Sequence, residues 1–219
     1  MTALRVRDRL LLVALPVGAW ATSYHPGADW RAFVRRLAGR PEYRGPWMIA
    51  EHVLLYTTIP AIVALIAWWW LSRRGLLAPI RESFALHDAR RTVAAGVLGG
   101  LGISVVALGF LVAVGGPLHA PHFDGWAALA NVASNWYEEI IFRGLLLLSL
   151  VAATGRRDAG VVLSSLFFAA THTQYPVSFQ ALIAVNTMLL SWARLWTGSL
   201  WTAWIGHQVC DMVVDLWFG

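Results

Sequence analysis

Apolar residues run in long blocks along this chain, and short clusters of arginine, glycine and proline separate the blocks. A helix that crosses a membrane needs about 20 apolar residues, and it must be helical because lipid cannot satisfy open backbone groups. Six blocks are candidate spans: residues 47–71, 93–114, 126–153, 159–171, 177–196 and 198–217. The block at 126–153 can hold one tilted helix, or a short helix followed by a span. Gly96 and Gly100 form a small-xxx-small pair that would permit close contact with another helix.

A further block, residues 10–21, allows two interpretations. It follows three arginines, contains Pro16 and ends in Ala19, Trp20 and Ala21, a pattern that is also typical of a signal peptide. We interpret it as an uncleaved first span or a re-entrant anchor. The whole pattern then predicts an all-α, polytopic helical membrane protein with about seven transmembrane helices.

The segment that follows this block is amphipathic. Trp30, Phe33, Val34 and Leu37 recur at helical spacing, with arginines between them. This pattern predicts an interfacial helix that lies on anionic lipid headgroups. A solvated basic loop is the alternative.

The composition excludes several classes of protein. Hydrophobic residues make up 58% of the chain and charged residues only 13%, whereas a soluble domain has roughly a quarter charged residues. The net charge of +5 does not indicate nucleic acid, because the basic residues separate apolar blocks instead of covering one face. A soluble enzyme, a DNA-binding module and a disordered tail are therefore excluded. The single cysteine, Cys210, excludes a disulfide framework.

The basic residues also predict an orientation, and all 17 of them are arginine. With seven spans and the N-terminus inside, eleven arginines lie on the inner side and five on the outer side. The opposite orientation reverses these numbers, so the positive-inside rule favours an inside N-terminus and an outside C-terminus.

Three clusters of motif residues place ionisable groups inside the predicted spans, where a charge costs at least ~2.5–3.5 kcal/mol at mid-helix. In the first, Glu139 and Arg143 are four residues apart and can pair on one helix face. Glu138 is rotated by about 100° from Glu139 and lacks that partner. Desolvation disfavours the charged form of a carboxylate and suits it to general acid–base chemistry. A packing salt bridge beside an interfacial glutamate is the alternative.

The other two clusters are Phe168 with His172, and His207 with Asp211. His207 and Asp211 are also four residues apart, so the carboxylate can orient the imidazole. With the N-terminus inside, all the motif helices bring their polar residues to the outer half of the membrane. We therefore expect the three clusters to meet at one depth.

The ordered set Glu-Glu-x-x-x-Arg, Phe-x-x-x-His and His-x-x-x-Asp resembles the CAAX prenyl protease and bacteriocin-processing family of glutamate-type intramembrane proteases. The resemblance covers about residues 126–219 and implies an intramembrane protease core with a catalytic four-helix arrangement there. Residues 1–125 carry no family signature. They would supply the N-terminal anchor, the interfacial helix and accessory transmembrane helices of one integrated membrane domain.

The resemblance also implies a role for each motif residue. The catalytic residues would be Glu138, His172, His207 and Asp211, and the supporting residues would be Glu139, Arg143 and Phe168. Glu138 would activate water with His172 as its partner, while His207 and Asp211 would stabilise the oxyanion. Many members of the family have Asn in place of Asp211. An ionised aspartate cannot donate to an oxyanion, so Asp211 is either protonated or serves only to orient His207.

The implied activity is that of an intramembrane endopeptidase in the bacterial cytoplasmic membrane, with its active site in the outer half. Its partners would be the lipid bilayer and a membrane-anchored protein or peptide substrate cut near the C-terminus, and no nucleic acid is expected. We expect no cofactor. The alternative is zinc held by Glu138, His172 and His207, although no HExxH motif is present. A non-catalytic immunity or scaffold protein of the same fold, and an ion-coupled transporter, are the other functions considered.

Overall fold

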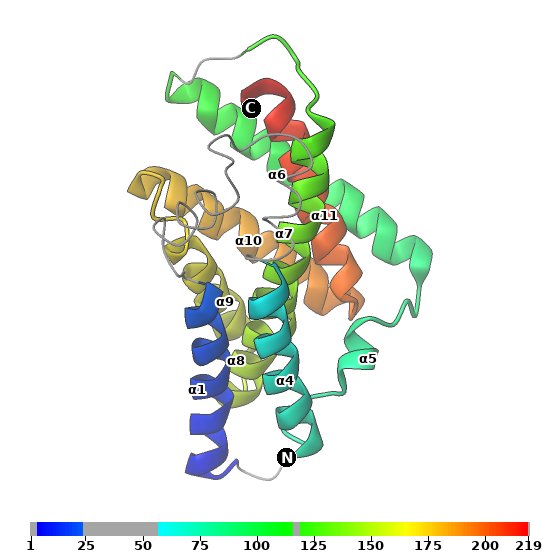
Figure 1. Cartoon of the computed structure of the whole chain (residues 1–219), viewed down its shortest axis with the longest axis vertical. Helices are drawn as coiled ribbons and strands as arrows, with labels where there is room; N and C mark the ends of the chain where they lie inside the picture. Colours follow the sequence, from blue (N-terminus) through cyan, green and yellow to red (C-terminus); the bar gives the residue numbers. More distant parts are fainter. Residues whose placement is uncertain (1–3, 24–56, 116–118, 219) are drawn as a thin grey trace, which may run out of the picture.

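The computed structural model describes residues 4–23, 57–115 and 119–218, and no β-strand occurs within these ranges. The elements are α1 (Val6–Ser23), α4 (Ile59–Arg73), α5 (Ile80–Ser83), α6 (Ala89–Ala113), α7 (Gly125–Glu139), the π-helix η2 (Ile140–Leu146), α8 (Leu147–Thr154), α9 (Arg157–Ala170), α10 (Val177–Thr197) and α11 (Leu200–Phe218) (Figure 1). The predicted all-α fold class is confirmed for the described part of the chain. The predicted interfacial helix around residues 30–37 and the first part of the span at 47–71 lie outside the described residues.

Within the described ranges, α6 is the one helix that is by itself both long enough and apolar enough to cross a membrane. The blocks at 10–21, 126–153, 159–171, 177–196 and 198–217 nevertheless form helices close to their predicted bounds, and the described part of the block at 47–71 is helical to near its predicted end. The number of membrane spans therefore stays a prediction, while the helical character of the blocks is an observation.

Local sequence signals explain where several helices begin and end. The carboxylate of Asp124 accepts hydrogen bonds from the backbone N–H groups of Trp126 and Ala127, which caps the start of α7. Helices α8 and α10 end at Gly155 and Gly198, whose positive φ angles of 71° and 74° are typical of glycine at a helix C-terminus. These stops turn the chain back on itself twice before α11.

The block at 126–153 forms a single long helical segment with a π-helical section in its middle. Helices α7, η2 and α8 follow one another directly, and the backbone at Ile140 and Leu147 keeps right-handed helical dihedral angles. A π-helical turn is uncommon and often occurs at a functional site. Here it begins immediately after Glu138 and Glu139 and contains Arg143.

The small-xxx-small pair on α6 contacts α11. A Cβ atom built on Gly96 would lie 2.8 Å from the Cβ of Ile205, and one built on Gly100 would lie 2.6 Å from the backbone oxygen of Gly206. The predicted close contact is thus confirmed, and its partner is the helix that carries His207 and Asp211. Only glycine lets the two backbones approach to this distance.

Helix α1 is part of the packed interior. Leu12 on α1 and Trp68 on α4 are fully buried in the same apolar cluster as residues of η2 and α8. The indole Nε1 of Trp20 donates a hydrogen bond of 3.2 Å to the backbone oxygen of Phe167 on α9. This packing favours the interpretation of residues 10–21 as a retained helix, since a cleaved segment would leave these neighbours uncovered.

Candidate active site

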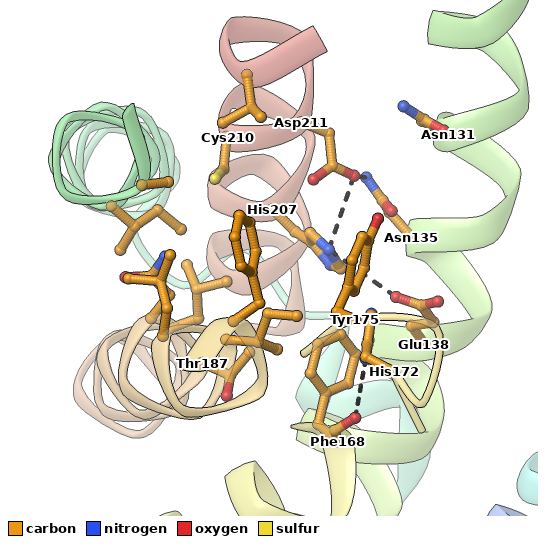
Figure 2. Close-up of a pocket in the computed structure, with 18 of the residues that line it drawn as sticks. Asn131, Asn135, Glu138, Phe168, His172, Tyr175, Thr187, His207, Cys210 and Asp211 are labelled. Carbon is orange, nitrogen blue, oxygen red and sulfur yellow. Dashed lines mark hydrogen bonds and ion pairs between the residues drawn. The ribbon is translucent and has the colours of Figure 1, made fainter. Parts of the chain in front are cut away.

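A cavity of about 600 Å³ opens between α6, α7, α10 and α11 and the turn that joins α9 to α10. Five of the seven residues singled out in the sequence line it: Glu138, Phe168, His172, His207 and Asp211 (Figure 2). The other two, Glu139 and Arg143, are buried behind its wall. Residues up to 73 positions apart in the chain, from Glu138 to Asp211, are thus brought to one site by the packing of α7 against α11 and the α9–α10 turn.

Glu139 is the most enclosed carboxylate of the site. Its side chain is fully buried, and its Oε1 atom lies 2.9 Å from a terminal guanidinium nitrogen of Arg143. The ion pair predicted from the four-residue spacing is therefore present. The same Oε1 atom lies 2.9 Å from Nδ1 of His207. Glu139 thus links the cation on its own helical segment to the imidazole on α11.

The contact with Glu139 sets the orientation of His207. A carboxylate oxygen accepts, so Nδ1 of His207 carries the proton in this hydrogen bond. Nε2 therefore faces the cavity, 3.9 Å from Oε2 of Glu138 and 3.7 Å from Oδ2 of Asp211 (Figure 2). Nδ1 is thus hydrogen-bonded to a carboxylate, whereas Nε2 lies near two carboxylates without a hydrogen bond to either.

Glu138 keeps its carboxylate available. Its side chain is 19% exposed, whereas that of Glu139 is fully buried. The hydroxyl of Tyr137 lies 3.4 Å from its Oε1 atom, a long hydrogen bond. The second carboxylate oxygen faces the cavity and the ring of His207. Two neighbouring glutamates therefore have different surroundings, one structural and one facing open space.

His172 lines the cavity from the turn that follows α9. Its Nδ1 atom lies 3.0 Å from the backbone oxygen of Phe168 and 3.1 Å from the hydroxyl of Thr171. Because a backbone carbonyl can only accept, Nδ1 carries the proton and Nε2 is left as an acceptor in the neutral ring. The imidazole stacks on the ring of Tyr175 at 6.1 Å between centroids.

Phe168 is the apolar centre of the site. Its ring lies 4.7 Å from that of His172 and 5.8 Å from that of His207, measured between centroids. The guanidinium of Arg143 lies over the same ring at 4.3 Å, in cation–π geometry. One phenyl ring therefore separates the buried cation from the cavity while it supports both histidines.

Two asparagines of α7 that the sequence analysis did not single out bond to α11, and Asn135 does so at a motif residue of the site. Nδ2 of Asn135 donates to Oδ2 of Asp211 at 2.8 Å and to Oε1 of Gln208 at 3.2 Å. Nδ2 of Asn131 donates to Oδ2 of Asp215 at 2.8 Å. The signal was available in the sequence, since Asn131 and Asn135 are four residues apart in an apolar block and share a face close to that of Glu138.

The zinc alternative would require Glu138, His172 and His207 to share one ion. Within the described ranges, no group of three or more His, Cys, Asp or Glu side chains lies close enough together to hold a metal ion. Both imidazoles also have Nδ1 engaged in hydrogen bonds, to Glu139 in one case and to Phe168 in the other. A histidine that donates from Nδ1 can still bind a proton or a metal ion at Nε2, so zinc stays an alternative.

Comparison with known proteins finds a family match for the part of the chain that carries this geometry. Residues 120–213 match the family described as Type II CAAX prenyl endopeptidase Rce1-like. This part of the chain is therefore similar to Rce1-like proteins. No curated protein and no solved structure matches the chain.

The match confirms the resemblance drawn from the three motifs. The matched residues include Glu138, His172, His207 and Asp211, together with the whole of α7, η2, α8, α9 and α10. The matched family is protease-related and membrane-embedded, which supports a peptidase activity. Helices α1, α4, α5 and α6 precede the matched residues in the chain.

Proposed function

We propose that this protein is an intramembrane endopeptidase that hydrolyses a peptide bond near the C-terminus of a membrane-anchored or exported substrate. The observation that carries the proposal is that two adjacent carboxylates lie in different surroundings. Glu139 is fully buried against Arg143 and His207, whereas Glu138 faces a cavity that also contains His172 and the Nε2 atom of His207.

Glu138 acts as the general base in this mechanism. A water molecule between Glu138 and His172 loses a proton to the Glu138 carboxylate as its oxygen attacks the scissile carbonyl carbon. The free Nε2 atom of His172 accepts the second water hydrogen and holds the nucleophile in line. When the tetrahedral intermediate collapses, the carbon–nitrogen bond breaks and Glu138 returns its proton to the leaving nitrogen.

His207 stabilises the negative charge that develops on the carbonyl oxygen. Its Nδ1–H group is held by Glu139, which fixes the ring so that Nε2–H points into the cavity. Donors that are already oriented toward the oxyanion do not have to reorganise during the reaction, which lowers the barrier. Asp211 accepts a hydrogen bond from Asn135, so in this mechanism it is an acceptor held beside His207 and does not donate to the oxyanion.

The proposed setting is the bacterial cytoplasmic membrane with an inside N-terminus and the active site in the outer half. The apolar length of α6 and the membrane-embedded family support this setting. An outward-facing site suits an exported or membrane-anchored substrate and suits a cytosolic prenylated substrate less well. The partners are thus a protein or peptide substrate and lipid, and no cofactor takes part.

Comparative proteomics of the membrane and secreted fractions tests the proposal. Cells that carry the Glu138→Gln or the His172→Ala variant should accumulate a longer precursor of at least one exported or membrane-anchored protein. Loss of a general base typically lowers a rate by about 10²–10⁴-fold, so the precursor should dominate. Retained biological function in both variants would instead indicate a non-catalytic immunity or scaffold protein. Cleavage by the purified protein should survive a chelator, and stoichiometric zinc whose removal abolishes cleavage would establish the zinc-dependent alternative.

A further inference from the structure

Helices α7 and α11 are joined by two equivalent hydrogen bonds between an asparagine amide and an aspartate carboxylate. Asn135 donates to Asp211 and Asn131 donates to Asp215, each at 2.8 Å. The asparagines are four residues apart on α7, and the aspartates are four residues apart on α11. We call the Asn135–Asp211 bond the inner rung and the Asn131–Asp215 bond the outer rung.

The two rungs differ in their surroundings. Asn135 is only 2% exposed, and Oδ2 of Asp211 lies 3.7 Å from Nε2 of His207. The outer rung lies at the surface, and Asp215 is exposed. The same chemistry therefore occurs twice between the same two helices, once beside the catalytic histidine and once a helical turn further from it.

The amide of Asn135 is fixed in one orientation. Its Nδ2 group faces two acceptors, the carboxylate of Asp211 and the Oε1 atom of Gln208. A half-turn of the amide would direct its oxygen at both acceptors and lose both hydrogen bonds. Asp211 is thus held by a buried donor that cannot rotate away.

We propose that Asn135 is a positioning residue that keeps the carboxylate of Asp211 from accepting a hydrogen bond from Nε2–H of His207. This inference rests on the proposed peptidase function. Oδ2 of Asp211 accepts from Asn135 at 2.8 Å, whereas its distance of 3.7 Å to Nε2 of His207 exceeds hydrogen-bond range. Without Asn135, the carboxylate swings onto Nε2–H and occupies the donor that the oxyanion needs. Asn135 therefore leaves that donor available to the substrate.

A double-mutant cycle between positions 135 and 211 tests the inference on the purified full-length protein. The assay uses a peptide from the precursor that accumulates in the Glu138→Gln cells. Asn135→Leu should lower kcat by roughly tenfold or more and change KM by less than about threefold, because the lost interaction is a hydrogen bond to a charged group. In the Asp211→Asn background the same change should cost less than about threefold, because a neutral amide does not compete for Nε2–H as a carboxylate does.

The outer rung supplies the matched control. Asn131→Leu removes an equivalent bond from the same helix pair and should lower kcat by less than about threefold. Equal losses from Asn131→Leu and Asn135→Leu would mean that the rungs only brace the helices, and this would overturn the inference. An equal loss from Asn135→Leu in both Asp211 backgrounds would overturn it too.

Two further measurements keep the result decisive. Asn135→Ala repeats the cycle with a smaller side chain, and thermal unfolding shows whether each variant is folded. Histidine side-chain ¹⁵N NMR measures the coupling between positions 135 and 211 without an activity assay. The Nε2 signal of His207 should shift on Asn135→Leu only when Asp211 is present.

If Glu138→Gln has no effect on cleavage, the proposed function itself fails. If Glu138→Gln abolishes cleavage and the cycle shows no coupling in kcat or in the NMR signal, only the role of Asn135 fails.

Discussion

Glu138 and Glu139 carry the same carboxylate, but the helix directs them into different surroundings. Glu139 has no exposed surface and shares one oxygen between Arg143 and His207, while Glu138 is 19% exposed to the cavity. A buried charge is tolerated only when it is paired, because removing it from water costs several kcal/mol. At the residue scale, therefore, Glu139 is held in a buried ion pair, whereas Glu138 faces the cavity.

This difference predicts that a Glu→Gln substitution affects stability at position 139 and activity at position 138. Glu139→Gln should lower the free energy of unfolding by about 3–5 kcal/mol, because it leaves the buried guanidinium of Arg143 without a counter-charge. Unfolding in detergent, followed by circular dichroism, measures the change. Glu138→Gln is the matched control and should leave the unfolding curve nearly unchanged while it abolishes cleavage. Equal destabilisation by the two variants would contradict the assignment.

Spacing alone predicted the contacts that lie within one helix. Glu139 and Arg143, and likewise His207 and Asp211, are separated by four residues and do lie close together. The hydrogen bond between Glu139 and His207 spans 68 residues and depends on how η2 and α7 pack against α11. No local pattern encodes that packing, so the link between the two motifs became visible only in the structure.

At the scale of the elements, the contact between α6 and α11 positions His207 and Asp211. Gly96 and Gly100 on α6 face Ile205, Gly206 and Val209 on α11, with no space for a side chain. The remaining α6 glycines at 99, 102 and 109 face open space. Two of the five glycines in this helix are therefore required by packing.

The contrast yields a prediction within one helix. In Gly100→Ala the new Cβ would lie 2.6 Å from the backbone oxygen of Gly206, so α6 and α11 must move apart. Overpacking of this kind typically costs about 1–3 kcal/mol, and a lower unfolding temperature in detergent should report it. Gly102→Ala is the control. It should be neutral or stabilising by up to ~1 kcal/mol, since alanine favours a helix and meets no neighbour there. A fall of equal size in both variants would argue against the close contact.

The block at 126–153 marks the limit of what periodicity predicts about elements. Its length indicated one helix or two, and the structure has one helical segment with a π-helical section over Ile140–Leu146. Every side chain of that section is buried, including those of Arg143 and Leu146. A π-turn depends on the neighbours that the shifted residues meet, and an unbroken apolar run does not reveal it. The helix ends, by contrast, followed Asp124, Gly155 and Gly198 as local chemistry requires.

At the scale of the whole molecule, arginine and tryptophan pair at the ends of helices. The guanidinium of Arg73 lies 5.5 Å from the ring of Trp69, that of Arg74 lies 3.8 Å from Trp70, and that of Arg91 lies 4.0 Å from Trp196. All three arginines belong to the side predicted to be cytoplasmic. Tryptophan and arginine both favour the headgroup region, so these pairs are suited to fix the depth of α4, α6 and α10 at one interface.

The orientation makes a prediction that decides the compartment of the substrate. Single cysteines are introduced by His122→Cys and Asp158→Cys in a Cys210→Ala background, and intact cells are treated with a maleimide that does not cross the cytoplasmic membrane. Both positions are exposed, His122 before α7 and Asp158 at the start of α9. With an inside N-terminus, only the cysteine at 122 should be labelled until the cells are permeabilised.

The reverse labelling pattern would place the loop before α7, and with it the adjacent cavity, on the cytoplasmic side. That loop lies beside the C-terminal end of α11, since the backbone N–H of His122 donates to the oxygen of Leu216. Asp211 lies between one and two turns before Leu216, so the loop and the cavity share one half of the membrane. Labelling at 122 therefore reports the side of the active site directly. A cytoplasmic result would redirect the search for substrates from exported proteins to cytosolic ones, while the chemistry of Glu138 and His207 would stand.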